Sequence, residues 1–262
     1  MLTLLEKQLH TSWLGHPVCY QECVESTNNL AKQMAKDGAS HGTVIVANQQ
    51  LAGKGRLGRT WISPKGCAIY TSLILKPHIL PCQASCLTLV AALATACAIE
   101  QVTGLNCQIK WPNDIVIDGR KVCGILTEMS ASADKIHYVV IGIGINVNMT
   151  AFDESVEATA ISLKQLLGHK VSRTELMAEL LMQMEYWYAV FEQKGNLSGM
   201  LDAYNQRLVN RDREVRILEP GNEWLAIARR INERGELVVE RDGAEQTIVS
   251  GEVSVRGVYG YV

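Results

Sequence analysis

Hydrophobic periodicity changes once along this chain, near Arg213, and that change limits the fold more than any other feature. From residue 18 to residue 208, alternating runs typical of β-strands interleave with longer apolar patterns of helical period. After residue 212, short β runs are separated by tight turn sequences, namely Pro220-Gly221-Asn222, Arg234-Gly235 and Asp242-Gly243. The pattern predicts a mixed α/β domain at residues 1–212 and a small antiparallel β-barrel at residues 213–262.

The first domain is expected to alternate strands with helices. The predicted strands cover residues 18–21, 43–47, 67–76, 107–111, 115–117, 122–129 and 137–147. The predicted helices cover residues 26–36, 83–103, 162–167, 172–193 and 197–208. Ser26 or Thr27 can cap the first helix, and Ser172 with Glu175 forms a capping box at the fourth. The first 16 or so residues are expected to be a short lead.

Charge and cysteine content narrow the class of protein. The chain has 25 basic and 27 acidic residues, and this balance disfavours a protein that coats nucleic acid by charge alone. All eight cysteines lie between Cys19 and Cys123, without a C-x-x-C pair, so we expect reduced and mostly buried thiols. The first ten residues mix acid and base and do not resemble a signal peptide. These features together predict a cytoplasmic protein.

The most apolar stretch, from Cys86 to Ile99, is about 14 residues long. A helix that spans a bilayer needs about 20 apolar residues. The stretch is therefore predicted to be a buried helix of the core, and no membrane association is expected.

Residues 53–59, with the sequence GKGRLGR, combine three glycines with three cations. Glycines let a backbone approach a ligand closely, and the cations provide charge for phosphate oxygens. The G-x-G-x-x-G spacing does not indicate a dinucleotide fold, because Trp61, Pro64 and Gly66 favour a loop where that fold needs a helix. The segment is predicted to be a phosphate-binding loop, with a solvated surface loop as the alternative.

Residues 110–114, with the sequence KWPND, precede a strong turn signal at Asp118-Gly119. Pro112 favours an extended chain, which places Asn113 and Asp114 at a strand edge. Asp114 can hold Mg²⁺ or a ribose, and Lys121 can meet a carboxylate or a phosphate. A plain hairpin without ligand contacts is the alternative.

Two further motifs give weaker evidence of ligand contact. Gly142 and Gly144 lie inside an apolar run that ends at Asn146, and glycines weaken a strand unless a backbone or ligand comes close. Ser26-Thr27-Asn28 is, taken alone, only a helix N-cap.

These motifs occur in the order typical of the biotin–protein ligases, and the chain resembles that family from about residue 18 to about residue 256. The matching segments are Ser26-Thr27-Asn28, Gln50 with Gly53 to Arg59 and Trp61, Lys110 to Asp114, Lys121 to Leu126 with Glu128, Gly142 to Asn146, and Gly251 to Arg256. The resemblance implies an α+β fold, with a mixed β-sheet flanked by helices in a class II synthetase-like catalytic domain. It also implies a small C-terminal SH3-like β-barrel.

The resemblance further implies a two-step reaction. Biotin and ATP with Mg²⁺ would form biotinoyl-AMP, and a lysine of a biotin carboxyl carrier domain would then take the biotin. Members that also repress transcription carry an N-terminal DNA-binding domain, and only about 16 residues precede the first predicted strand here. No nucleic-acid binding is therefore expected, while monomer and homodimer both stay open.

The family motifs also assign roles residue by residue. Ser26, Thr27, Gln50, Arg56 and Gly124 would line the biotin pocket, Lys121 would meet the biotin carboxylate and the α-phosphate, and Asn113, Asp114 and Asn146 would face the nucleotide. Lys54, Arg56 and Arg59 would close over phosphate, and Asn28, Gly53, Gly55, Trp61 and Lys110 belong to the same ligand-binding segments. The catalytic candidates are Lys121, Arg56 and Asp114, and Asp114 is the candidate Mg²⁺ ligand.

Two other functions fit the sequence less well. A lipoate or octanoate ligase would share the fold, but Gln50 and the Ser26-Thr27 pair favour a ligand ring with polar edges. A biotin- or nucleotide-binding regulator without turnover would not need both Lys121 and Arg56.

Overall fold

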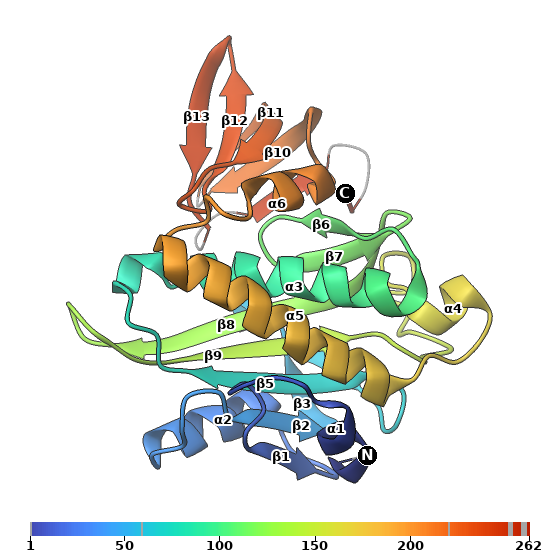
Figure 1. The fold of residues 1–262 in the computed structure, drawn as a ribbon. Coiled ribbons are helices and arrows are strands. Elements are labelled where there is room, and N and C mark those ends of the chain that lie inside the picture. The colour runs from blue at the N-terminus through green and yellow to red at the C-terminus, as the bar shows by residue number, and fades with distance from the viewer. Residues whose placement is uncertain (1, 59, 220, 251–253, 258–260) are drawn as a thin grey trace.

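The computed structural model describes residues 2–58, 60–219, 221–250, 254–257 and 261–262. Two main sheets organise this part of the chain (Figure 1). The larger has seven strands in the order β1-β2-β5-β9-β8-β7-β6, and the smaller has five in the order β13-β12-β11-β10-β14. Helices flank the larger sheet, so the predicted fold class, a mixed sheet with helices followed by an antiparallel β unit, is confirmed.

The larger sheet is mixed because only β1 and β2 among its pairs run parallel. Its strands are β1 (Val18–Gln21), β2 (Val44–Ala47), β5 (Ile69–Leu75), β6 (Gln108–Lys110), β7 (Asp114–Ile117), β8 (Arg120–Ala131) and β9 (Ile136–Ile145). The helices are α1 (Leu2–Gln8), α2 (Thr27–Lys36), α3 (Cys86–Thr103), α4 (Leu163–Leu167), α5 (Arg173–Lys194) and α6 (Leu201–Arg207). A 3-10 turn, η2 (Pro81–Gln83), precedes α3.

Helix α3 lies at the centre of the core, between the sheet and α5 (Figure 1). Its buried residues occupy most of its circumference, so that it is covered on nearly all sides. By length and hydropathy, Pro81–Thr103 could cross a membrane, but 72% of its apolar window is buried inside the molecule. The prediction of a buried core helix is therefore confirmed.

The first residues are more structured than a short lead. They contain helix α1, and Glu185 of α5 fixes the segment that follows it. One carboxylate oxygen accepts from the Ser12 backbone N–H at 2.7 Å, and the other accepts from Trp13 and Leu14, both at 3.0 Å. The sequence gives little sign of this, because the partner carboxylate lies more than 170 residues away.

Residues 50–63 form a hairpin where a glycine-rich loop was predicted. Strand β3 (Gln50–Lys54) pairs with β4 (Thr60–Ser63), and the 3-10 turn η1 (Arg56–Gly58) lies between them. The pairing shifts register between Gln50 and Gly53, and most of β3 is exposed. An irregular, exposed hairpin has no clean alternation of apolar and polar residues, which explains why the strands were missed.

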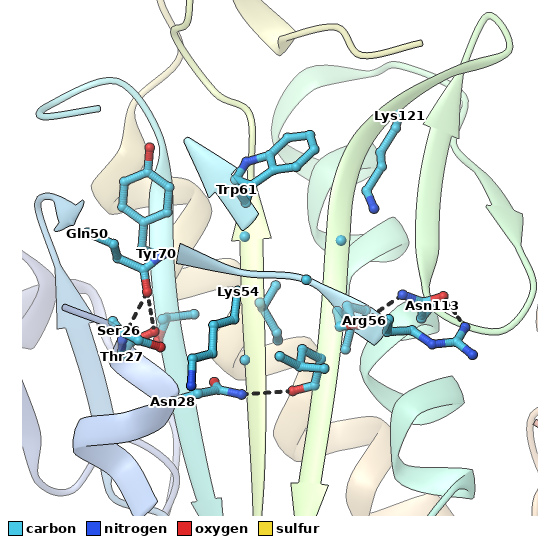
Figure 2. A pocket seen from close by; sticks show the side chains of 18 residues that line it. Ser26, Thr27, Asn28, Gln50, Lys54, Arg56, Trp61, Tyr70, Asn113 and Lys121 are labelled. Atoms are coloured by element: carbon cyan, nitrogen blue, oxygen red, sulfur yellow. Dashed lines mark hydrogen bonds between the residues drawn. The ribbon is translucent and has the colours of Figure 1, made fainter. Parts of the chain in front are cut away.

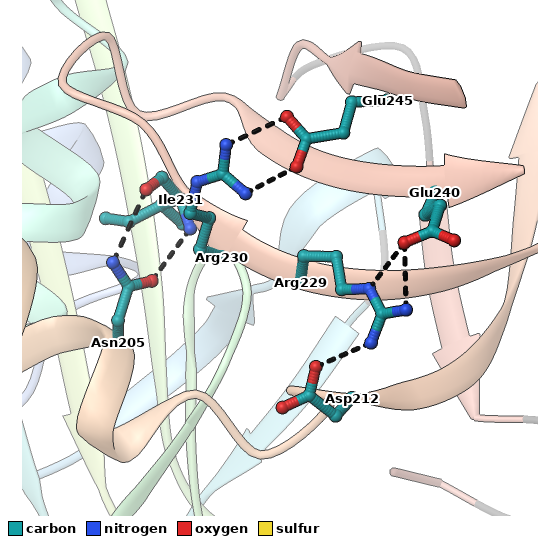
Figure 3. A network of polar contacts seen from close by, with 7 residues as sticks. All are labelled: Asn205, Asp212, Arg229, Arg230, Ile231, Glu240 and Glu245. Atoms are coloured by element: carbon teal, nitrogen blue, oxygen red, sulfur yellow. Dashed lines mark hydrogen bonds and ion pairs between the residues drawn. The ribbon is translucent and has the colours of Figure 1, made fainter. Parts of the chain in front are cut away.

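The smaller sheet contains β10 (Arg213–Glu219), β11 (Asn222–Ile231), β12 (Leu237–Arg241), β13 (Ala244–Ile248) and β14 (Ser254–Gly257). Strand β10 begins at the predicted change of character, and the domain boundary at 212/213 itself stays a prediction. Arg229 and Arg230 of β11 both form ion pairs (Figure 3). Arg229 lies 2.8 Å from both Asp212 and Glu240, and Arg230 lies 2.6 Å from Glu245.

The turn between β11 and β12 packs against residues around the larger sheet. The Trp111 indole N–H donates to the Gly235 carbonyl at 3.1 Å, and the Leu197 N–H donates to the Glu233 carbonyl at 2.9 Å. Gly235 has φ +77°, and a Cβ there would lie 3.3 Å from Leu89 of α3. These contacts fix the position of Trp111, which immediately precedes the segment with the polar residues Asn113 and Asp114.

Candidate active site

A pocket lies between strands β5, β8 and β9 on one side and the start of α2 with the β3–β4 hairpin on the other (Figure 2). Its lining residues are Ser26, Thr27, Asn28, Gln50, Lys54, Gly55, Arg56, Trp61, Tyr70, Thr71, Asn113, Lys121, Gly124, Ile125, Leu126, Gly142, Ile143 and Gly144. The structure thus brings together most of the residues singled out from the sequence, although their segments are far apart in the chain.

Three glycines make the floor of this pocket. Gly124 of β8 pairs directly with Gly144 of β9, and Gly142 pairs with Leu126. A Cβ on Gly144 would have no atom nearer than the Gly124 carbonyl oxygen at 3.9 Å, so this position opens into the pocket. Glycine at these positions lets a flat ligand approach the backbone closely.

One end of the pocket carries fixed polar groups. The backbone N–H and hydroxyl of Thr27 donate to Gln50 Oε1 at 2.9 and 3.1 Å, and Gln50 Nε2 donates to Ser63 Oγ at 3.1 Å. These bonds fix the orientation of the Gln50 amide and attach the hairpin to α2. Ser26 occupies the N-cap position of α2, but its side chain makes no capping hydrogen bond. Ser26 lines the pocket instead.

Asn28 lines the pocket and is held by a partly buried polar network. Its Oδ1 accepts from the Ser72 hydroxyl at 2.6 Å, and its Nδ2 donates to Glu128 at 2.8 Å and to the Leu126 carbonyl at 3.2 Å. Lys32 Nζ lies 2.6 Å from the other oxygen of Glu128. Because each group is paired, the network fixes α2 against β5 and β8.

The Glu128 carboxylate makes this network pH-sensitive. Burial raises its pKa, but the hydrogen bonds from Lys32 and Asn28 outweigh burial and leave the pKa below its ordinary value. The charged form is therefore favoured in the folded state, and its contribution to stability is present above a pH of about 4.3. We expect this contribution to be lost as the pH falls through the lowered pKa.

The substitution Glu128→Gln tests this expectation. It should flatten the dependence of the unfolding free energy on pH between about pH 5 and pH 3. Chemical unfolding at a series of pH values measures this slope, and Glu179→Gln, on α5 outside the network, is the matched control. An unchanged slope in the Glu128 variant would contradict the assignment.

The other end of the pocket is cationic. Lys121 Nζ lies 2.6 Å from Asp114 Oδ1, and it is 5.6 Å from the centre of the Trp61 ring. Arg56 Nη1 donates to Asn113 Oδ1 at 2.9 Å, and Asn113 in turn donates to a backbone carbonyl of β8. Two cations against one carboxylate leave a net positive charge at this end, which favours an anionic ligand.

Gly124 is what allows Lys121 to meet Asp114. Asp114 of β7 pairs in register with Gly124, and the register shift that follows places Lys121 on the same side. A Cβ on Gly124 would lie 2.8 Å from Lys121 Nζ and 3.6 Å from Asp114 Oδ1. The lysine side chain therefore crosses the space that any other residue would fill.

Other predicted residues lie outside the pocket lining. Gly53 is inside the hairpin, where a Cβ would lie 2.5 Å from the Trp61 carbonyl oxygen. Asn146 donates to the carbonyls of Lys121 and Ile161, both at 3.3 Å, and so supports the strand that carries Lys121. A motif shows that a residue belongs to a site, but the direction of its side chain depends on packing.

Lys110 and Asp114 also lie outside the pocket lining. Lys110 Nζ donates to the Tyr261 carbonyl and lies 3.5 Å from the centre of the Tyr261 ring. Asp114 reaches the site through Lys121 and does not itself line the pocket. Arg59 and Gly251 to Val253 of the last motif lie outside the described residues.

The sequence did not single out Tyr70 and Thr71 of β5, which also line the pocket. All seven residues of β5 are buried, so no alternation of polarity distinguishes the face that borders the pocket. Gly142 and Gly144 did carry a signal, because glycines inside a strand indicate the close approach of another group.

Comparison with known proteins identifies the family to which this chain belongs. Residues 20–146 match the biotin/lipoate A/B protein ligase family, and residues 212–256 match the biotin protein ligase C terminal domain. The biotin–[acetyl-CoA-carboxylase] ligase of Paracoccus denitrificans is 33% identical over 228 residues, which cover 85% of this chain and 84% of that protein. The bifunctional ligase/repressor BirA of Bacillus subtilis is 41% identical over 182 residues, which cover 69% of this chain.

The chain spans 56% of the length of the Bacillus relatives. Among solved structures, the biotin protein ligase from Aquifex aeolicus in complex with biotin and ATP superposes with a TM-score of 0.81 and 28% identity. The match covers 92% of this chain and 98% of that one. Sequence, fold and pocket agree that this chain belongs to the biotin protein ligase family.

Proposed function

We propose that this protein is a biotin–[biotin carboxyl carrier protein] ligase, which uses biotin and ATP as Mg-ATP and modifies a lysine of a carboxyl carrier domain. The observation that carries the proposal is the polarity of the pocket. Fixed hydrogen-bonding groups at Thr27 and Gln50 face, across a glycine floor, the cations Lys121 and Arg56. A ligand with a polar ring at one end and a carboxylate at the other fits this arrangement.

Two reactions follow from this orientation. In the first, a biotin carboxylate oxygen attacks the α-phosphorus of ATP, the bond to the bridging oxygen breaks, and diphosphate leaves. In the second, the neutral amine of the acceptor lysine attacks the acyl carbon of biotinoyl-AMP, AMP leaves with the bonding electrons, and the amine loses a proton. Neither reaction needs a nucleophilic side chain of the enzyme.

The cationic end overcomes the repulsion in the first step. Two anions, the carboxylate and the triphosphate, must meet, and Lys121 and Arg56 offset their charges where negative charge builds up. Asp114, 2.6 Å from Lys121 Nζ, holds the ammonium in place before ligands arrive. After adenylation, we expect the same carboxylate to orient the incoming lysine amine.

The polar end selects the ligand ring. A ureido group has one acceptor oxygen and two N–H donors, which match the mixed donors and acceptors of Gln50, Thr27 and the Ser26 hydroxyl. Lys54, Gly55 and Trp61, carried by the hairpin, cover the pocket above the glycine floor. Such a cover would exclude water from the hydrolysable mixed anhydride.

Magnesium enters as part of the Mg-ATP substrate. Asp114 was the candidate ligand, but one of its oxygens pairs with Lys121 and the other accepts from the Tyr261 hydroxyl at 2.5 Å. Among the described residues, no group of three or more His, Cys, Asp or Glu side chains could hold a metal ion. Both oxygens of Asp114 are thus engaged within the protein, which supports an orienting role for this residue.

The remaining parts of the proposal concern partners and location. The acceptor is the carrier domain of a biotin-dependent carboxylase, as the name of the Paracoccus relative suggests. All eight cysteines are free, which suits the reducing cytoplasm. The net charge of −2 argues against binding nucleic acid by charge, which a mobility-shift assay at physiological salt checks. Sedimentation with and without ligands would decide between monomer and homodimer.

Pyrophosphate release from Mg-ATP tests the proposal, with biotin, lipoate and octanoate offered separately. Release with biotin alone is expected, followed by transfer to a purified carrier domain. Release with lipoate or octanoate would make the protein a lipoate or octanoate ligase. Biotin binding without release from any acid would make it a regulator.

Gly124→Ala is expected to separate folding from catalysis. The new methyl group displaces Lys121 Nζ, which can move because it ends a flexible side chain. The unfolding free energy should therefore change little, while adenylation slows by a factor of about 10 to 100, the effect of a misplaced catalytic group. Urea unfolding and the pyrophosphate assay measure the two quantities, and equal activity of the variant would contradict the role given to the lysine.

A further inference from the structure

Tyr261 contacts two of the charged residues beside the pocket, although it lies about 150 residues away from them in the chain. Its hydroxyl donates to Asp114 Oδ2 at 2.5 Å. Its carbonyl accepts from Lys110 Nζ, and the same ammonium lies 3.5 Å from the centre of the Tyr261 ring. One residue therefore touches both ends of the segment from Lys110 to Asp114.

The contact divides the two oxygens of Asp114 between two partners. Oδ1 faces Lys121 Nζ at 2.6 Å, and Oδ2 faces the Tyr261 hydroxyl. A carboxylate held at both oxygens cannot rotate freely, so the direction of Oδ1 and the place of the ammonium above Gly124 are set together. The Asp114 and Lys121 side chains are 14% and 22% exposed, and hydrogen bonds to charged groups are strong in such partly buried positions.

We propose that Tyr261 is a positioning residue for the adenylation step. It acts through Asp114 on Lys121, in the order Tyr261 hydroxyl, Asp114 carboxylate, Lys121 ammonium. This inference rests on the proposed function, because it assigns Tyr261 a role in that reaction. It extends the site to a residue outside every motif singled out from the sequence.

Tyr261→Phe isolates the hydroxyl, because the ring above Lys110 and the backbone carbonyl remain. The kcat of biotin-dependent pyrophosphate release is expected to fall about tenfold or more, the effect of losing a hydrogen bond to a charged group. The KM for biotin should stay within about twofold, because Thr27 and Gln50 hold the ring end and are not touched. A merely structural role would instead lower the unfolding midpoint and leave kcat unchanged.

A double-mutant cycle with Asp114→Asn tests the order of action. If Tyr261 acts through Asp114, adding Tyr261→Phe to Asp114→Asn should cause little further loss of kcat. Additive losses would overturn the proposal. If Asp114→Asn does not fold, the split between kcat and KM in Tyr261→Phe alone decides.

Tyr20→Phe is the matched control. Tyr20 lies on β1, at the opposite edge of the sheet from β6, and the substitution removes a hydroxyl that donates to Glu22 at 2.8 Å. This variant should retain the parent kcat. If the parent protein releases no pyrophosphate with any acid, the proposed function fails and this inference fails with it. If the parent is active and Tyr261→Phe is equally active, only the role of Tyr261 is overturned.

Discussion

Replacing Lys121 with alanine is expected to reduce biotin-dependent pyrophosphate release by a factor of about 100 to 1,000. The ammonium is the cation held closest to Asp114, and it borders the pocket where the carboxylate and the α-phosphate would meet. Its removal takes away one of the cations that offset the repulsion between two anions. Initial rates of pyrophosphate release with saturating Mg-ATP and biotin would measure this loss of activity.

Two variants control this experiment. Lys65→Ala removes another lysine whose Nζ lies 2.6 Å from a carboxylate, but that pair, with Glu22, is exposed and outside the pocket. It should leave the rate unchanged. Lys121→Arg retains the charge but not the compact ammonium, and it should recover only part of the activity. Full activity of Lys121→Ala would remove this residue from the mechanism.

Replacing Gly142 with alanine should damage both the fold and the pocket. A Cβ there would lie 2.1 Å from Asn28 Oδ1, a contact that real structures do not tolerate. Asn28 has no easy movement, because Ser72, Glu128 and the Leu126 carbonyl hold its amide. We expect the unfolding free energy to fall by about 1–3 kcal/mol, from overpacking and broken hydrogen bonds.

Gly144→Ala is the matched comparison, two residues along the same strand. Its Cβ would have no neighbour nearer than 3.9 Å and would project into the pocket. It should therefore leave stability nearly unchanged while weakening biotin binding by about tenfold, the effect of filling space that a ligand needs. Urea unfolding and titration calorimetry separate the two effects. Equal stabilities of the two variants would contradict the packing described around Asn28.

The helix boundaries could be predicted because short capping sequences mark where a helix begins and ends. The α5 helix begins after Ser172, whose hydroxyl accepts from the Glu175 N–H at 3.3 Å, and it ends at Gly195, in the left-handed conformation. Such signals act over three or four residues and are visible in any sequence. The hairpin at residues 50–63 was missed because its strands are irregular and mostly exposed. Their apolar residues therefore follow neither the two-residue spacing of a strand nor the 3.6-residue spacing of a helix.

The site was predictable in its membership but not in its geometry. The order of the motifs identified Thr27, Gln50, Arg56, Lys121 and Gly124, and all five line one pocket. The same reasoning placed Asn146 at the nucleotide, which stays a prediction, and the structure adds that its amide donates to the Lys121 carbonyl. No local pattern indicated Tyr261, because its partner Asp114 is 147 residues away.

The sequence by itself determined most of the strands and helices, though not α1 or the β3–β4 hairpin, together with the buried character of the central helix and the family of the chain. These properties depend on periodicity, caps and short motifs, which act between near neighbours in the chain. The tertiary structure alone decided which side chains meet, such as Asn28 with Glu128 and Lys121 with Asp114 over the bare backbone of Gly124. Such contacts require strand register and close packing, and both are properties of the folded sheet as a whole.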